Sequence, residues 1–211
     1  MPTPDAPLPA ALIDALVGQG WFEWPNAVSD ALCQALLSEA AAHAAAGALH
    51  QAGVGRGARH QVNAAVRRDE IKWLTGETAA QQGYLRQMAA LQVQLNRALF
   101  LGLIDYEGHF ARYPAGGFYK KHTDSFRGAA NRMVSTVLYL NPDWQAAWGG
   151  ALVIDLKDPE QAPMVITPEL GKLVIFMSED MPHEVLPTLH PRVSVAGWFR
   201  CSAGGLVDLA R

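Results

Sequence analysis

The chain has 211 residues, half of them hydrophobic and 18% charged, a composition typical of one compact globular unit with a sizeable core. Its formal net charge of -3 provides no overall basic field, so neither nucleic acid nor a membrane is expected as a partner. Two cysteines exclude a disulfide framework, and because neither a signal peptide nor an apolar run of membrane-spanning length is recognisable, we expect a cytoplasmic protein.

The first half of the chain has helical patterns. Prolines at positions 2, 4, 7 and 9 predict a flexible N-terminal tail over residues 1–9. A short helix is expected over 10–17, followed by an extended piece over 20–24. A longer, alanine-rich helix should then begin at a cap on Asn26 or Ser29 and run to about Ala46.

Residues 47–68 are rich in glycine and arginine and have no sustained periodicity, which predicts a long mobile loop with two irregular strands. Its arginines are either simply solvated or available to grip a substrate: Arg56, Arg59, Arg67 and Arg68. Thr78, with Gln81 three residues later, forms a capping-box pattern for a helix that continues to about Leu101.

From Tyr106 onward the pattern changes to short strands separated by turn residues. Eight are expected, at roughly 106–113, 118–124, 133–140, 150–155, 163–167, 172–177, 183–186 and 192–200. The predicted fold class is therefore α+β, mainly β. A double-stranded β-helix (jelly roll) core over about 106–200 would be buttressed by N-terminal helices over about 10–105, in a single domain over 10–211.

A histidine and a carboxylate two residues apart mark the candidate site. On a strand, His122 and Asp124 project to the same side and could share one metal ion. His183, which follows the strand LVIFM and a turn, is the strongest candidate for a third ligand. Two histidines and one carboxylate leave coordination positions open, as in non-haem Fe(II) oxygenases. Arg192 could then bind the distal carboxylate of 2-oxoglutarate bidentately.

The remaining histidines are expected to have ordinary roles. Surface positions are predicted for four of them: His43, His50, His60 and His109. His190 is read as a turn residue because Pro191 follows it.

Several stretches together resemble the iron and 2-oxoglutarate dependent dioxygenases, within them the prolyl hydroxylases, and especially the bacterial relatives of the animal oxygen-sensing (HIF-type) enzymes. The matching stretches are ARYPAGGFYKKHTD, MVSTVLYLNPDW, WGGALVI, KLVIFMSEDMPHEV and HPRVSVAGWF. RRDEIKWLTG, at 67–76, is similar to the segment that those enzymes place beside the substrate. The combination is much more specific than any single motif.

This resemblance implies a role for each matching residue. It implies three iron ligands: His122, Asp124 and His183. Arg192 would anchor the 2-oxoglutarate C5 carboxylate with help from Tyr139, Tyr113 would lie near the metal-chelating end, and Trp198 would help to wall the pocket. The cofactor and co-substrates would be Fe(II), 2-oxoglutarate and O2, with ascorbate as an accessory reductant. Taken one at a time, the three aromatic residues could equally be plain core.

On the substrate side, the resemblance implies that Asp69 and Arg132 form an ion pair that ties the substrate loop to the core, although such a pair could also be an ordinary surface contact. Trp73 and Tyr119 complete the residues expected beside the substrate. Ala196 departs from the pattern, because the animal enzymes have a threonine there.

The implied activity is hydroxylation of a prolyl residue, at C4, in a protein or peptide, with succinate and CO2 as co-products. A translation factor is the preferred target, and oxygen sensing is a further role found among similar enzymes. Two alternatives remain open. An oxygenase of a free amino acid or other small molecule would use the same iron site, and a non-catalytic jelly-roll binding module would need no metal ligands at all.

Overall fold

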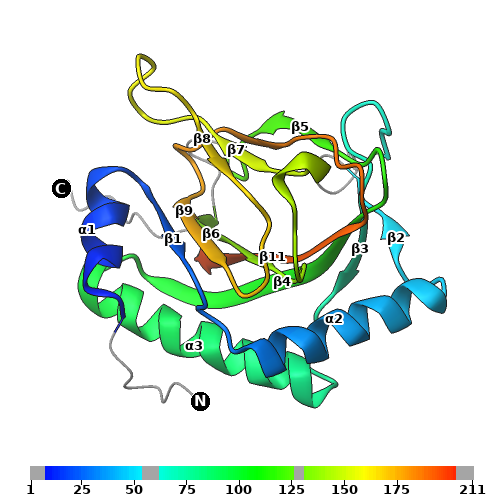
Figure 1. Ribbon diagram of the computed structural model, residues 1–211. Coiled ribbons are helices and arrows are strands. Elements are labelled where there is room, and N and C mark those ends of the chain that lie inside the picture. Colours follow the sequence, from blue (N-terminus) through cyan, green and yellow to red (C-terminus); the bar gives the residue numbers. More distant parts are fainter. Residues whose placement is uncertain (1–7, 54–61, 126–130, 203–211) are drawn as a thin grey trace.

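The computed structural model describes residues 8–53, 62–125 and 131–202, which form two β-sheets and three α-helices (Figure 1). The strands are β1 (Trp21–Trp24), β2 (His50–Gln51), β3 (Glu70–Trp73), β4 (Leu103–Tyr113), β5 (Tyr119–His122), β6 (Arg132–Tyr139), β7 (Leu152–Ile154), β8 (Met164–Ile166), β9 (Leu173–Met177), β10 (His183–Val185) and β11 (Arg192–Cys201). All eight strands predicted beyond residue 106 are present.

The strands form a large sheet in the order β1-β9-β6-β11-β4-β3-β2 and a small sheet in the order β5-β10-β7-β8. Neighbouring strands are antiparallel, and β11 lies between β4 and β6 along most of its length. β1 lies in the extended piece predicted over 20–24, and β3 follows the loop predicted over 47–68. They join the large sheet because β9 and β4 offer them hydrogen-bonding edges, and these partners are distant in the sequence.

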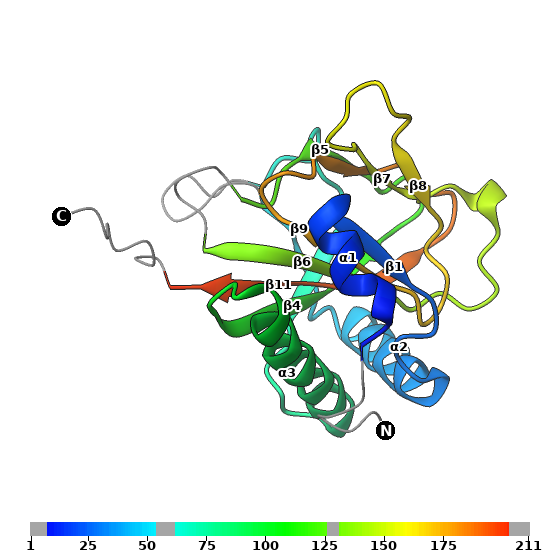
Figure 2. The ribbon, with the colours of Figure 1, turned by 90° about the vertical axis from the view of Figure 1, so that its left-hand side faces the viewer.

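The helices are α1 (Ala10–Gly18), α2 (Asp30–Ala45) and α3 (Ala79–Leu99). Figure 2 shows α2 and α3 side by side against one face of the large sheet. The capping box at α3 is only half formed. The Gln81 amide donates to the Thr78 hydroxyl at 3.1 Å. The Gln81 side chain, however, accepts from the amides of Thr75 and Gly76 instead of the Thr78 amide.

Two apolar layers hold these elements together. Between the helices and the large sheet, α3 buries Tyr84 and Leu95 against side chains such as Phe110. Between the two sheets, buried residues such as Leu152 and Phe176 form a second cluster. Because side chains alternate along β4 and β11, every second residue of each strand points between the sheets, where the candidate site lies.

Some predictions fall on residues that the structure does not describe. The predicted tail over 1–9 is described only at residues 8 and 9, and the predicted loop over 47–68 lacks 54–61, which include Arg56, Arg59 and His60. No helix in the described ranges combines the length and the apolar character that crossing a bilayer requires.

Candidate active site

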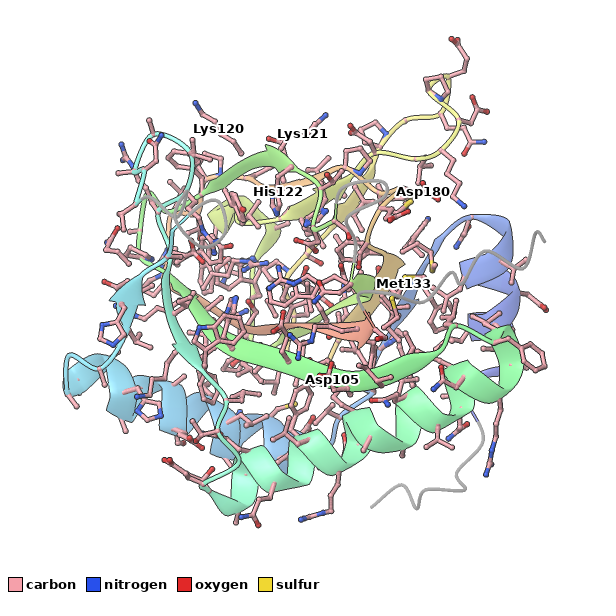
Figure 3. The ribbon with its side chains drawn as sticks, turned by 180° about the vertical axis from the view of Figure 1, so that it is seen from behind. Asp105, Lys120, Lys121, His122, Met133 and Asp180 are labelled. Atoms are coloured by element: carbon pink, nitrogen blue, oxygen red, sulfur yellow. The ribbon has the colours of Figure 1, made fainter. Side chains whose placement is uncertain are left out.

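The three predicted metal ligands meet at one end of the space between the sheets. His122 ends β5 and His183 begins β10, and the two residues lie opposite each other in the antiparallel pair. Asp124 follows His122 by two residues, and one ligand atom from each of the three side chains lies within 4.8 Å of the others. Figure 3 shows His122 on β5 next to Lys120 and Lys121, whose side chains are exposed.

Backbone carbonyls orient both imidazole rings. His122 donates through Nδ1 to the carbonyl of Lys120 at 2.8 Å, and His183 donates through Nδ1 to the carbonyl of Met181 at 2.9 Å. Each Nε2 is thereby left as the lone-pair nitrogen, facing Asp124 at 3.6 Å from His122 and 3.7 Å from His183. This tautomer leaves both Nε2 lone pairs available to a metal, so the three residues could hold a divalent ion.

The electrostatics of the triad favour metal binding. Burial acts to raise the pKa of Asp124, but the neighbouring His183 and His122 outweigh burial and hold that pKa below its usual range. Burial lowers the pKa of His183, although Asp124 opposes the shift. A carboxylate that stays ionised beside a neutral imidazole is the protonation state in which both can bind a cation.

Two buried serines, which were not among the predicted site residues, form hydrogen bonds beside the triad. Ser135, on β6, donates to Asp124 Oδ2 at 2.7 Å, and its Oγ lies 2.8 Å from the Oγ of Ser178. Ser135 occupies the same face of β6 as Tyr139, four residues further on. The sequence did offer a signal for Ser135: a serine at an inward-facing position of a buried strand needs a hydrogen-bond partner inside the protein.

Arg192 occupies the interior end of the cleft. The residue is only 1% exposed, and its guanidinium donates to the carbonyl of Gly150 at 2.9 Å and to Ser194 Oγ at 3.3 Å. Within the described ranges of the chain no carboxylate pairs with it. Because a buried charge without a counter-ion is costly, this position favours an anionic ligand.

Two tyrosines flank that guanidinium. Its Cζ lies 4.9 Å from the ring centre of Tyr113 and 5.0 Å from that of Tyr139. Burial raises the pKa of Tyr139 to about 12, so its hydroxyl keeps its proton. This hydroxyl is buried and has no hydrogen-bond partner among the described residues. A hydroxyl without an acceptor, beside a guanidinium that has no carboxylate partner among the described residues, fits the distal carboxylate of 2-oxoglutarate.

The metal triad and Arg192 open into one cleft of about 480 Å³. Its lining includes five of the remaining predicted site residues: Tyr113, Tyr119, Trp73, Arg132 and Trp198. At the mouth, Trp73 is 45% exposed and its ring stands edge-on to His109, with 5.0 Å between ring centres. The Arg132 guanidinium covers Trp198, with its Cζ 3.5 Å from the ring centre. The cleft therefore joins an open aromatic mouth to a buried cationic end.

Arg67 also lines the cleft. It donates to both oxygens of Asp69, at 2.7 and 2.5 Å, and its Cζ lies 4.2 Å from the ring centre of Tyr119. Tyr119 in turn stacks on His122, with 3.6 Å between ring centres. The segment before β3 is thus connected to a metal ligand through one guanidinium and one ring.

Three expectations are wrong. Asp69 does not pair with Arg132, since Asp69 binds Arg67 while Arg132 binds Glu107, with Nη2 at 2.7 Å from Oε1. Arg67 is therefore not a solvated loop arginine. His109 is not a surface histidine: it is 4% exposed, and burial, with the nearby Arg67 as the second cause, lowers its pKa to about 4. All three errors concern partners or burial that depend on how the strands pair.

The chain matches the family model described as the 2OG-Fe(II) oxygenase superfamily over residues 108–200. It is 41% identical to a prolyl-4-hydroxylase of known structure from Pseudomonas putida, covering 90% of this chain and 98% of that one, with a TM-score of 0.84. The fold also matches, with a TM-score of 0.80, a Trichoplax adhaerens prolyl hydroxylase solved with a hypoxia inducible factor peptide. That match is 24% identical and covers 90% of this chain and 87% of that one.

Among curated proteins, the chain is 33% identical over 91 residues to a hypoxia-inducible factor prolyl hydroxylase from Caenorhabditis elegans. That match spans 42% of this chain but only 12% of the length of the worm protein. The Pseudomonas structure, by contrast, is matched over almost its whole length. Its sequence identity to this chain is also well above the level at which two proteins share only a fold. The triad, the cationic end of the cleft and this similarity agree, and the chain belongs to the 2OG-Fe(II) oxygenases, among the prolyl 4-hydroxylases.

Proposed function

We propose that the protein hydroxylates C4 of a prolyl residue in a protein or peptide, using Fe(II), 2-oxoglutarate and O2 and releasing succinate and CO2. The main support is the joint geometry of the cleft. His122, Asp124 and His183 stand between an open aromatic mouth and a buried guanidinium that no carboxylate of the described residues pairs with. The 41% identity to the Pseudomonas putida prolyl-4-hydroxylase supports the same reaction.

Each end of the cleft has its own task in this proposal. The triad holds the iron, which together with 2-oxoglutarate and O2 supplies the oxidising chemistry. Arg192 and the Tyr139 hydroxyl bind the C5 carboxylate and so fix the direction in which the co-substrate lies. Tyr113, whose pKa burial raises far above its usual value, offers a protonated hydroxyl nearer the metal. The buried walls exclude water from the reacting carbon.

The mouth of the cleft suits a peptide. Trp73 is partly exposed there, and Trp198, Arg132 and Tyr119 line the path from it to the triad. Aromatic faces pack well against a proline ring, and the opening leaves room for residues on either side of it. Asp69 acts indirectly, by holding Arg67 on Tyr119. A protein of the same fold, from Trichoplax adhaerens, was solved with a peptide fragment.

Among protein substrates, we propose a translation protein as the first target to test, because the sequence resembles prolyl hydroxylases that act on such targets. A cytoplasmic location would agree with such a target and with the buried thiol of Cys33, which forms no disulfide. An oxygen-sensing role would require that turnover vary with O2 over the range that cells experience.

The test is succinate formation from 2-oxoglutarate by iron-loaded protein on admission of air, with and without a library of prolyl peptides. We expect peptide-stimulated succinate that disappears in His122→Ala, together with a 16 Da mass increase on proline (the mass of one oxygen atom). A free-proline arm separates the reactions: stimulation by free proline alone would favour a small-molecule oxygenase. Absence of metal binding by the wild type would favour a non-catalytic binding module.

A further inference from the structure

One of the three metal ligands is not fixed by a β-ladder. His122 and His183 face each other within the β5–β10 pair, so backbone pairing and carbonyl bonds set their positions. Asp124 lies two residues beyond the paired part of β5 and has no strand partner. Since a metal site needs its ligands held within fractions of an ångström, something else must position this carboxylate.

Ser135 is suited to that task because it belongs to the rigid centre of the large sheet. It pairs with Phe176 on one side, in β9, and with Trp198 on the other, in β11. The residue is 1% exposed and its Oγ reaches Asp124 Oδ2 at 2.7 Å. The carboxylate is thereby connected to a strand that is hydrogen-bonded along both edges.

The direction of the hydrogen bonds follows from the donors available. An ionised carboxylate only accepts, so the single hydroxyl proton of Ser135 goes to Asp124. The contact of 2.8 Å between Ser135 and Ser178 must then be donated by Ser178. Ser178 itself is fully buried, and its amide donates to the carbonyl of Met133 in β6. The three groups form a directed chain, from Ser178 to Ser135 to Asp124, in which each bond strengthens the next.

We propose that Ser135, oriented by Ser178, is a positioning residue that holds Asp124 in its metal-binding orientation. This inference rests on the proposed function, because it takes the triad as the iron site. Oδ2, which Ser135 holds, lies 3.7 Å from His183 Nε2, and Oδ1 lies 3.6 Å from His122 Nε2. Loss of the Ser135 hydroxyl would release the carboxylate to rotate, and partners of this kind typically contribute ten- to a hundredfold to metal affinity.

The experiment measures Co(II) affinity of the full chain at one fixed pH, by calorimetric titration without 2-oxoglutarate. We expect Ser135→Ala to bind Co(II) about tenfold or more weakly than wild type, Ser178→Ala to lose less, and Ser135→Thr, which keeps the hydroxyl, to bind nearly as wild type. Ser194→Ala is the matched control. Ser194 is equally buried on the neighbouring strand but bonds Arg192, so its loss should weaken 2-oxoglutarate binding and spare Co(II).

Thermal unfolding of the metal-free variants separates positioning from folding. If Ser135→Ala does not fold, the comparison of Ser178→Ala with wild type decides, and an unchanged Co(II) affinity there overturns the proposal. Equal Co(II) affinity of wild type and folded Ser135→Ala also overturns it, as does an equal loss in Ser194→Ala. Failure of the wild type to bind Co(II) would instead remove the proposed function, and this inference with it.

Discussion

His109 gives the protein a pH-dependent stability that one substitution should remove. Burial, assisted by the guanidinium of Arg67 and opposed by Asp69, lowers its pKa from 6.5 to about 4, and Arg132 also disfavours the proton. Between pH 6.5 and pH 4, His109 is therefore protonated in the unfolded chain but not in the folded chain. The folded state consequently loses stability as the pH falls through this range. Since each pKa unit is worth about 1.4 kcal/mol, the full loss is on the order of 3 kcal/mol.

The assay is urea denaturation of chelator-treated wild type and His109→Leu at pH values from 4 to 7. Leucine cannot be protonated, so the variant should not show the loss of unfolding free energy that His109 causes in the wild type. The difference between variant and wild type should therefore shift in favour of the variant by on the order of 3 kcal/mol between pH 7 and pH 4. His50→Leu, at an exposed position in β2, should follow the wild type throughout. Parallel curves for wild type and His109→Leu would refute the reasoning.

Three further substitutions test other parts of the structure. Arg192→Gln should weaken 2-oxoglutarate binding by at least about thirtyfold and spare Co(II), because it removes the buried partner of a carboxylate; unchanged calorimetric affinity for 2-oxoglutarate would contradict the assignment. Asp69→Asn leaves Arg67 buried without a counter-charge and should lower the unfolding free energy in urea by about 3–5 kcal/mol. A variant with Arg67→Met added should regain part of that loss, and no recovery would count against the ion pair. Gly197→Ala would place a Cβ 2.1 Å from the Tyr106 hydroxyl oxygen and should cost about 1–3 kcal/mol in thermal unfolding, whereas an unchanged melting temperature would show that this contact is loose.

The residues that the sequence predicted for the two ends of the candidate site lie together in the structure. His122, Asp124, His183 and Arg192 all face the cleft that the structure contains. His122 and Asp124 approach each other for a reason that goes beyond strand parity. Asp124 lies past the end of β5, so its approach to His122 depends on Ser135 as well as on the two-residue spacing.

The partners of the charged residues were much harder to predict. Arg132 was expected to bind Asp69, but the chain also offers Glu107, which lies directly across from Trp198 in the β4–β11 pair. Because Arg132 already covers the Trp198 ring, Glu107 is the carboxylate within its reach. Which acid meets which base is a property of the cross-strand register, and register depends on pairings between residues far apart in the chain.

Sequence alone determined what depends on local periodicity and residue chemistry: the eight strands beyond residue 106, the helical stripe of α3, and a donor set suited to Fe(II). The tertiary structure alone decided which polar groups are buried and with whom they pair. His109 became a neutral core histidine and Arg67 a buried cation because strands from both halves of the chain enclose them. Burial and hydrogen-bond partners are set by contacts between distant segments, and no local pattern records those contacts.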